Sequence, residues 1–332
     1  MPSARTLVAV TVLALVPLAG CQAEKAPARP RPVASVPPQP APAYDAEAEP
    51  ASAVLSLVPQ DADTVTVTDW DAIRVQLGQP DLTSEGLGTD RFAFWERADT
   101  ESAALTEGML RADGSTFELD YGFTQDDVDW EAHWRGEDGR GFALALRPDL
   151  ALDGVRRAIA DGIGPLEGAE LRAADHLVVA GTSETDVWAN EEQWEPLVAE
   201  PATATYLQRG CTPLNEALGP DGDAEAQAAL LEKHPVTTLD DVSGFALGFG
   251  DHTAIAWFEL GRSDLFDRLR IGEDWPVPPF ARTFTNGAAD PSSGRLGYAV
   301  DDPPAAAGLT LLRELPFSVC PEVVPYDAPT GL

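Results

Sequence analysis

Residues that carry nucleophilic and metal chemistry are scarce in this sequence. Its 332 residues include three cysteines and four histidines. No two of the histidines have the spacing that would place both on one face of a helix, and the HExxH zinc motif is absent. The GxSxG nucleophile elbow is absent as well. We therefore expect no metal ion, no cofactor and no catalytic residue, although the sequence does not exclude an enzyme.

Basic residues are also few. The chain has 22 Lys and Arg against 55 Asp and Glu, a net charge of −33, nearly all of it in residues 51–332. Proteins bind DNA and RNA by neutralising phosphates with lysine and arginine, so nucleic acid is excluded as a partner. A basic or neutral envelope protein or a small cationic ligand would be attracted instead. A well-solvated surface accounts for the acidity equally well.

A long apolar run occurs at the N-terminus. It extends from Leu7 to Leu18, follows Arg5 and ends in the tetrapeptide Leu18-Ala19-Gly20-Cys21. A positive start, a short apolar stretch and small residues before the cut are typical of a signal peptide, and the run is shorter than the roughly 18 residues that span a bilayer. The tetrapeptide resembles the lipobox of bacterial lipoproteins. That resemblance implies removal of residues 1–20 and a palmitate-type lipid anchor on Cys21, at the outer face of the cell membrane.

Residues 21–50 are dominated by proline and alanine and contain almost no large apolar side chains. Such a segment cannot bury enough surface to offset the entropy of ordering. Proline-rich linkers are extended, at about 3.1 Å per residue. We expect residues 21–50 to be a disordered stalk that holds a folded body away from the membrane.

Two cysteines remain after lipidation, Cys211 and Cys320. Neither belongs to a CxxC pair, which disfavours a redox or zinc role. Because disulfides persist in oxidising exteriors, we expect the two to be bonded. Two buried free thiols are the alternative.

The body contains similar segments in the same order twice. Residues 64–81 and 203–221 each predict a strand, a turn and a short helix that ends in Leu-Gly. Residues 141–162 and 254–275 each predict a strand that leads into a helix, and so does a third pair, 176–194 and 295–315. The order predicts an α+β fold of two tandem duplicated subdomains, 51–200 and 201–332, each with a mixed or antiparallel sheet and helices on one side.

Several polar residues are expected to begin these helices. Asp149 is the predicted N-cap of one helix, and Asp302 precedes two prolines that suit a first turn. Ser183 and Asp186 have the spacing of a capping box, which predicts a helix carrying Trp188 and Trp194.

Two acidic clusters are candidate ligand sites. Asp221, Asp223, Glu225 and Glu232 have calcium-loop spacing, but Ala226 occupies the position that requires glycine, so a helix start is the better interpretation.

The second cluster contains the residues that could form a surface for a cation or a sugar, namely Asp126, Asp127, Asp129, Trp130 and Trp134. An exposed acidic turn with one buried tryptophan is the simpler interpretation.

The segment VPQDAD at 58–63 weakly resembles the "PADA" opening of uncharacterised bacterial envelope proteins with a tandem α+β body. The resemblance implies an envelope location and no activity. Binding or scaffolding in the envelope is the expected function, with a ligand groove between the two halves, lined by aromatics and rimmed by acids. The alternatives are an envelope hydrolase that uses acidic residues, with Asp127 and Asp129 as its candidates, and a structural spacer without a ligand.

Overall fold

The computed structural model describes residues 37–137 and 139–326. From Pro38 onward the chain forms one compact unit. The predicted signal peptide, Cys21 and most of the predicted stalk lie outside the described residues. Within the described part, no helix combines the length and the apolar character needed to cross a bilayer.

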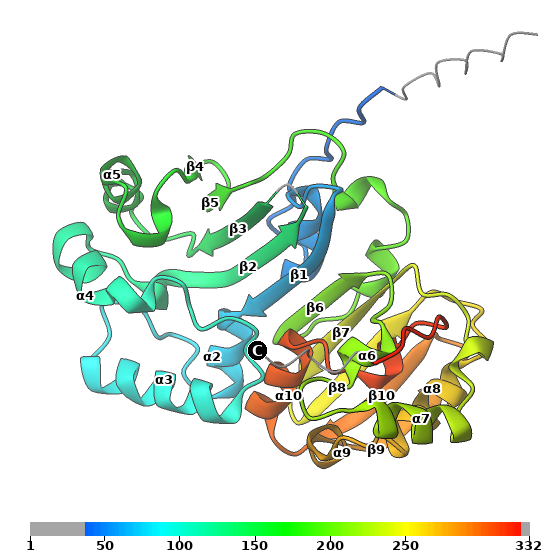
Figure 1. The fold of residues 1–332 in the computed structure, drawn as a ribbon. Coiled ribbons are helices and arrows are strands. Elements are labelled where there is room, and N and C mark those ends of the chain that lie inside the picture. Colours follow the sequence, from blue (N-terminus) through cyan, green and yellow to red (C-terminus); the bar gives the residue numbers. More distant parts are fainter. Residues whose placement is uncertain (1–36, 138, 327–332) are drawn as a thin grey trace, which may run out of the picture. The chain divides into compact units, whose positions relative to one another are not determined.

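In the part of the chain that the structure describes, ten strands form a single sheet, and every pairing in it is antiparallel (Figure 1). The strands are β1 (Ala62–Asp69), β2 (Val128–Gly136), β3 (Gly139–Leu146), β4 (Glu170–Arg172), β5 (Leu177–Ala180), β6 (Ala204–Arg209), β7 (Gly244–Gly250), β8 (Thr253–Phe258), β9 (Phe284–Asp290) and β10 (Arg295–Val300). Their order is β4-β5-β3-β2-β1-β6-β7-β8-β10-β9. The predicted α+β class is confirmed.

The strand order is the same in both halves when it is followed outward from the centre. One half contains β1, β2, β3, β5 and β4, and the other contains β6, β7, β8, β10 and β9. The first strands of the two halves pair with each other, with Val65 opposite Leu207. The two expected sheets are therefore joined into one. Duplication, and a division into 51–200 and 201–332, stay interpretations.

Helices cover one face of this sheet, as expected. They are α2 (Trp70–Gln76), α3 (Gly88–Glu101), α4 (Gly114–Thr116), α5 (Asp153–Asp161), α6 (Leu214–Ala217), α7 (Ala224–Lys233), α8 (Leu265–Glu273), α9 (Pro278–Thr283) and α10 (Pro303–Leu311). The short helix α1 (Pro50–Ala53) lies on the opposite face. In the first half, Ile73, Phe94 and Val155 from three helices share a core with Leu144 of the sheet. In the second half, helices α8 to α10 pack on Phe245 and its neighbours.

Residues 38–58 and 183–198 cover the centre of the opposite face, over a core that includes Val65, Trp130 and Leu207. The backbone N–H of Gln39 donates to the Asp186 carboxylate at 2.9 Å. The described end of the predicted stalk is thus packed on the body. The prediction of a disordered stalk over residues 21–50 was wrong from residue 38 onward. Residues far away in the sequence, such as Asp186, contact this segment, and its composition does not reveal those contacts.

Two of the predicted helix starts were wrong. Helix α5 begins at Asp153 with Leu152 as its N-cap, while Asp149 pairs with Arg147 at 3.4 Å. Between β5 and β6, the described segment forms two short 3-10 turns, Trp188–Asn190 and Glu195–Leu197, in place of the predicted helix. The third start is confirmed, since Asp302 accepts a hydrogen bond from the N–H of Ala305 in α10.

Without a helix between them, Trp188 and Trp194 stack face to face, with ring centroids 3.9 Å apart. The guanidinium of Arg209 lies 5.2 and 5.4 Å from the two rings. Glu191 holds that guanidinium with two contacts of 2.9 Å. The loop after β5 is therefore fixed by ring stacking and a cation.

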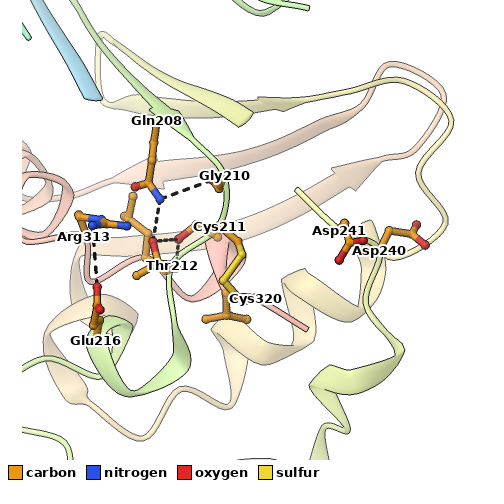
Figure 2. Close-up of a disulfide and its surroundings, with 12 residues drawn as sticks. Gln208, Gly210, Cys211, Thr212, Glu216, Asp240, Asp241, Arg313 and Cys320 are labelled. Carbon is orange, nitrogen blue, oxygen red and sulfur yellow. Dashed lines mark hydrogen bonds and ion pairs between the residues drawn. A yellow bond between two sulfur atoms is a disulfide. The ribbon is translucent and has the colours of Figure 1, made fainter. Parts of the chain in front are cut away.

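A disulfide joins Cys211 to Cys320, with the Cα atoms 5.0 Å apart (Figure 2). Beside it, the N–H of Thr212 donates to Ser318 O at 2.8 Å, and the N–H of Cys320 donates to Thr212 O at 2.9 Å. The predicted pairing is confirmed, and it fixes the C-terminal segment to the loop after β6.

Candidate functional site

A cleft of about 740 Å³ lies on the helical face, between α3 and the following loop on one side and α10 on the other. We call it the α3–α10 cleft. The first wall belongs to the first half of the sheet and the second wall to the second half. Its position between the halves agrees with the expected groove, whereas the aromatic lining that we expected is missing from the residues that the structure describes around it.

The wall formed by α10 is apolar. Its sequence, PPAAAGLTL, contains no charged residue. Ala306 and Ala307 are buried, but the side chain of Leu311 is 49% exposed. At Gly308, which lines the cleft, a Cβ atom would meet no atom within 4 Å. The helix therefore presents an unpartnered apolar side to the cleft.

Buried polar side chains of the sheet and of an adjacent turn hold the opposite wall, the loop 102–110. The N–H of Leu105 donates to the hydroxyl of Thr68 in β1 at 3.1 Å. The N–H of Met109 lies 3.1 and 3.2 Å from the two carboxylate oxygens of Glu131 in β2, and Gln125 accepts from Leu110. The loop lacks regular structure but its position is fixed.

Arg111 lies at the end of the cleft and separates it from a second pocket of about 440 Å³. Its guanidinium carbon is 4.3 Å from the ring centroid of Trp95. Two of its nitrogens contact the Asp99 carboxylate at 2.8 and 2.9 Å. The charge of Arg111 is thus matched by Asp99.

The second pocket reaches one of the predicted ligand residues, Asp126. This carboxylate is only 3% exposed. It accepts hydrogen bonds from Arg91 Nε at 2.6 Å, from Trp95 Nε1 at 2.8 Å and from the Thr124 hydroxyl at 2.9 Å. Two of the three donors, Arg91 and Trp95, belong to α3, so Asp126 joins α3 to the 3-10 turn that precedes β2.

The neighbouring carboxylates are also engaged. Asp127 is buried and accepts from the N–H groups of Thr124 and Ser84, at 2.8 and 3.1 Å. Asp129 is partly exposed and pairs with the buried Arg74 at 3.2 Å. The expected exposed acidic turn was wrong, because arginine, tryptophan and backbone donors from distant segments meet these acids.

Trp130 and Trp134 lie in the core on the other side of the sheet. Both are buried, and Trp134 Nε1 donates to Gly181 O at 3.0 Å. The five residues proposed as a ligand surface thus do not share one surface. Alternation along β2 places Asp129 and the two tryptophans on opposite faces, and Asp126 and Asp127 lie in the 3-10 turn that precedes the strand.

Asp69 and Asp129 have altered acidities. Burial raises the pKa of Asp69 to about 6, although the N–H of Ala72 at the start of α2 donates to it and opposes the shift. Burial also raises the pKa of Asp129, and Arg74 opposes that shift. The geometry gives Asp69 a capping role.

The calcium-loop spacing near residue 221 is used for helix capping, as expected. Asp223 accepts from the N–H of Ala226 at 2.7 Å and begins α7. Among the described residues, no group of three His, Cys, Asp or Glu side chains is arranged to hold a metal ion.

The cleft could not be located from the sequence, because its walls come from residues 98–112 and 304–311. One local signal was available. The nine residues of α10 contain no charge, which is unusual for a helix that is exposed on one side.

The sequence matches no protein-family model and no curated protein. Among solved structures, the chain is similar to crystal form I of TP0453, with 9% sequence identity and a TM-score of 0.33. The similarity covers 81% of this chain and 100% of the other. At this TM-score the likeness carries no argument about fold or function.

Proposed function

We propose that this protein is a lipoprotein, tethered through Cys21 to the outer face of the cell membrane, and that it binds a ligand in the α3–α10 cleft. The observation that carries the proposal is the apolar side of α10, which faces the loop 102–110 across a hollow. Surface helices of globular proteins normally turn polar residues outward. A bound ligand would cover this side.

The dimensions of the cleft support binding. Ligand sites are concave, roughly 300–1,000 Å³ in volume, and mostly apolar with a few polar groups that orient the ligand. Ala98, Leu105 and Leu311 supply apolar walls, and Thr106 and Glu107 supply polar groups.

The disulfide supports the proposed compartment, since such bonds are retained outside the cytoplasm. The LAGC segment that ends at residue 21 supports the anchor. A hydrolase acting through Asp127 and Asp129 has less support, because both carboxylates are held by partners within the fold.

Native mass spectrometry tests the binding function. A protease site placed between residues 25 and 30 would release the body from the envelope of the cells that make it, without detergent. We expect the wild type and Leu312→Trp, a change at an exposed position that does not line the cleft, to carry the same additional mass. Gly308→Trp, which fills the open space above α10, should carry none. An additional mass retained by Gly308→Trp, or absent from the wild type, would contradict the proposal.

A further inference from the structure

We infer that the ligand of the α3–α10 cleft is an amphipathic cation, with an apolar chain along α10 and an ammonium group at Thr106 and Glu107. The inference rests on the proposed function. It adds the chemical class of the ligand, which can be tested separately from the location of the site.

The two walls of the α3–α10 cleft indicate that the ligand has an apolar chain. Ala307, Gly308 and Leu311 line one side, and Ala98 and Leu105 line the other. These side chains are small or aliphatic. An alkyl chain that displaces water from between them gains the free energy of apolar burial.

The charge of the head group follows from three lining residues. Asp99, Glu107 and Arg111 supply two carboxylates and one guanidinium, a net charge of −1. Arg111 is already paired with Asp99. Glu107 is exposed, and its carboxylate has no hydrogen bond or ion pair with another residue in the described part of the chain. Glu107 is therefore the carboxylate that is available to a cation.

The hydroxyl of Thr106 specifies the head group further. Its oxygen is buried and has no hydrogen-bond partner among the described residues. A buried hydroxyl without a partner is uncommon in proteins, and its lone pairs can accept from an N–H donor. An ammonium group between Thr106 and Glu107 would satisfy the hydroxyl and the carboxylate together. A quaternary ammonium has no N–H and would satisfy only the carboxylate.

The net negative charge of the whole protein also favours a cationic ligand. A net charge of −33 raises the local concentration of cations and repels anions, most strongly at low ionic strength. Cationic amphiphiles would therefore be both attracted to the body and matched by the cleft.

Isothermal titration calorimetry with four probes that share one alkyl chain tests the inference. The probes are octylammonium, octyltrimethylammonium, octanol and octyl sulfate, each below its micelle concentration. The protein is the chain from residue 22 onward, which retains the whole compact unit that starts at Pro38.

We expect octylammonium to bind about tenfold more tightly than octanol, the effect of one partly solvated charge pair, and octyl sulfate to bind most weakly. Glu107→Gln should remove most of the preference for octylammonium over octanol. Thr106→Val should reduce the affinity for octylammonium more than that for octyltrimethylammonium. Gly308→Trp should abolish binding of all four probes. Leu312→Trp, the same bulky substitution at an exposed position just after α10 that does not line the cleft, should bind as the wild type does. Circular dichroism melts of each variant show that the fold is intact.

The possible failures are distinguishable. If Gly308→Trp abolishes binding but octyl sulfate and octanol bind as tightly as octylammonium, the cleft is a binding site and the inferred ligand class is wrong. If no probe binds the wild type, the ligand class is wrong, while the mass spectrometry of the envelope protein still decides the proposed function. If Gly308→Trp binds the probes unchanged, both the site and the ligand class are wrong.

Discussion

The hydroxyl of Thr68, in the central strand β1, accepts a hydrogen bond from the backbone N–H of Leu105 at 3.1 Å. Thr68 is fully buried, and Leu105 lines the α3–α10 cleft. A polar side chain inside the sheet thus sets the position of a wall of the candidate site. The stability of the core and the shape of the cleft are therefore coupled.

Replacing Thr68 by valine tests this coupling. Thr68→Val keeps the shape of the side chain but leaves the Leu105 N–H buried without an acceptor, which costs about 1–3 kcal/mol. We expect a loss of that size in the free energy of unfolding by urea, and faster amide hydrogen exchange in residues 104–110. Thr66→Val in the same strand is the matched control, because Thr66 is only half-buried and its hydroxyl makes a long contact of 3.5 Å. Equal stabilities of the two variants would show that Thr68 does not hold the loop.

Removing the disulfide should lower the stability of the body substantially. Cys211 and Cys320 are 109 positions apart, and for a loop of that length the chain-entropy model gives about 4–5 kcal/mol. We expect the double variant Cys211→Ala/Cys320→Ala to unfold at a markedly lower urea concentration. The wild type in the presence of a reductant should move to the same midpoint. An unchanged midpoint in both cases would contradict a structural role for this bond.

Asp69 should make stability depend on pH. Its pKa is about 6 in the folded protein and 3.8 as the reference value, so the folded state binds the proton more tightly. Its stabilising contribution is present below about pH 4 and is lost as the pH rises through 6. Asparagine can keep the cap on α2, because its amide oxygen can still accept from Ala72.

We therefore expect Asp69→Asn to be more stable than the wild type at pH 7, by up to about 3 kcal/mol. The difference should shrink toward zero near pH 4. Urea unfolding at pH 4, 5, 6 and 7 measures it. A difference that does not change with pH would mean that the carboxylate of Asp69 is not the group that titrates.

If Cys21 carries the lipid anchor, replacing it should release the protein from the membrane. Cys21→Ser removes the thiol that would carry the diacylglycerol, so this variant should incorporate no labelled palmitate. The wild type and the Cys211→Ala/Cys320→Ala variant should both be labelled and should sediment with membranes. Labelled Cys21→Ser protein would contradict the anchor.

Local sequence patterns correctly predicted strands, helices and caps whose stabilising contacts come from residues nearby in the sequence. The strand and short helix at 64–76 formed as expected, and Asp302 caps α10 through an N–H three residues away. The disulfide could be predicted because two cysteines remained after Cys21 was assigned.

Features that depend on distant residues were missed. Asp126 was expected to be exposed, but Arg91 and Trp95, which lie 35 and 31 residues earlier, bury it. Trp188 and Trp194 stack because Asp186 and its neighbours form a loop where a capped helix was expected. The pairing of β1 with β6, which joins the halves, has no local signature either.

We expect the α3–α10 cleft to hold a ligand in the cell envelope. A crystal structure of the body released from its own envelope without detergent tests it most directly. We expect electron density along Gly308 and Leu311 that ends at Thr106, with an amine nitrogen within hydrogen-bond distance of the Thr106 hydroxyl. An empty cleft closed by its own side chains, with ligand density at another place on the body, would contradict ligand binding between α3 and α10.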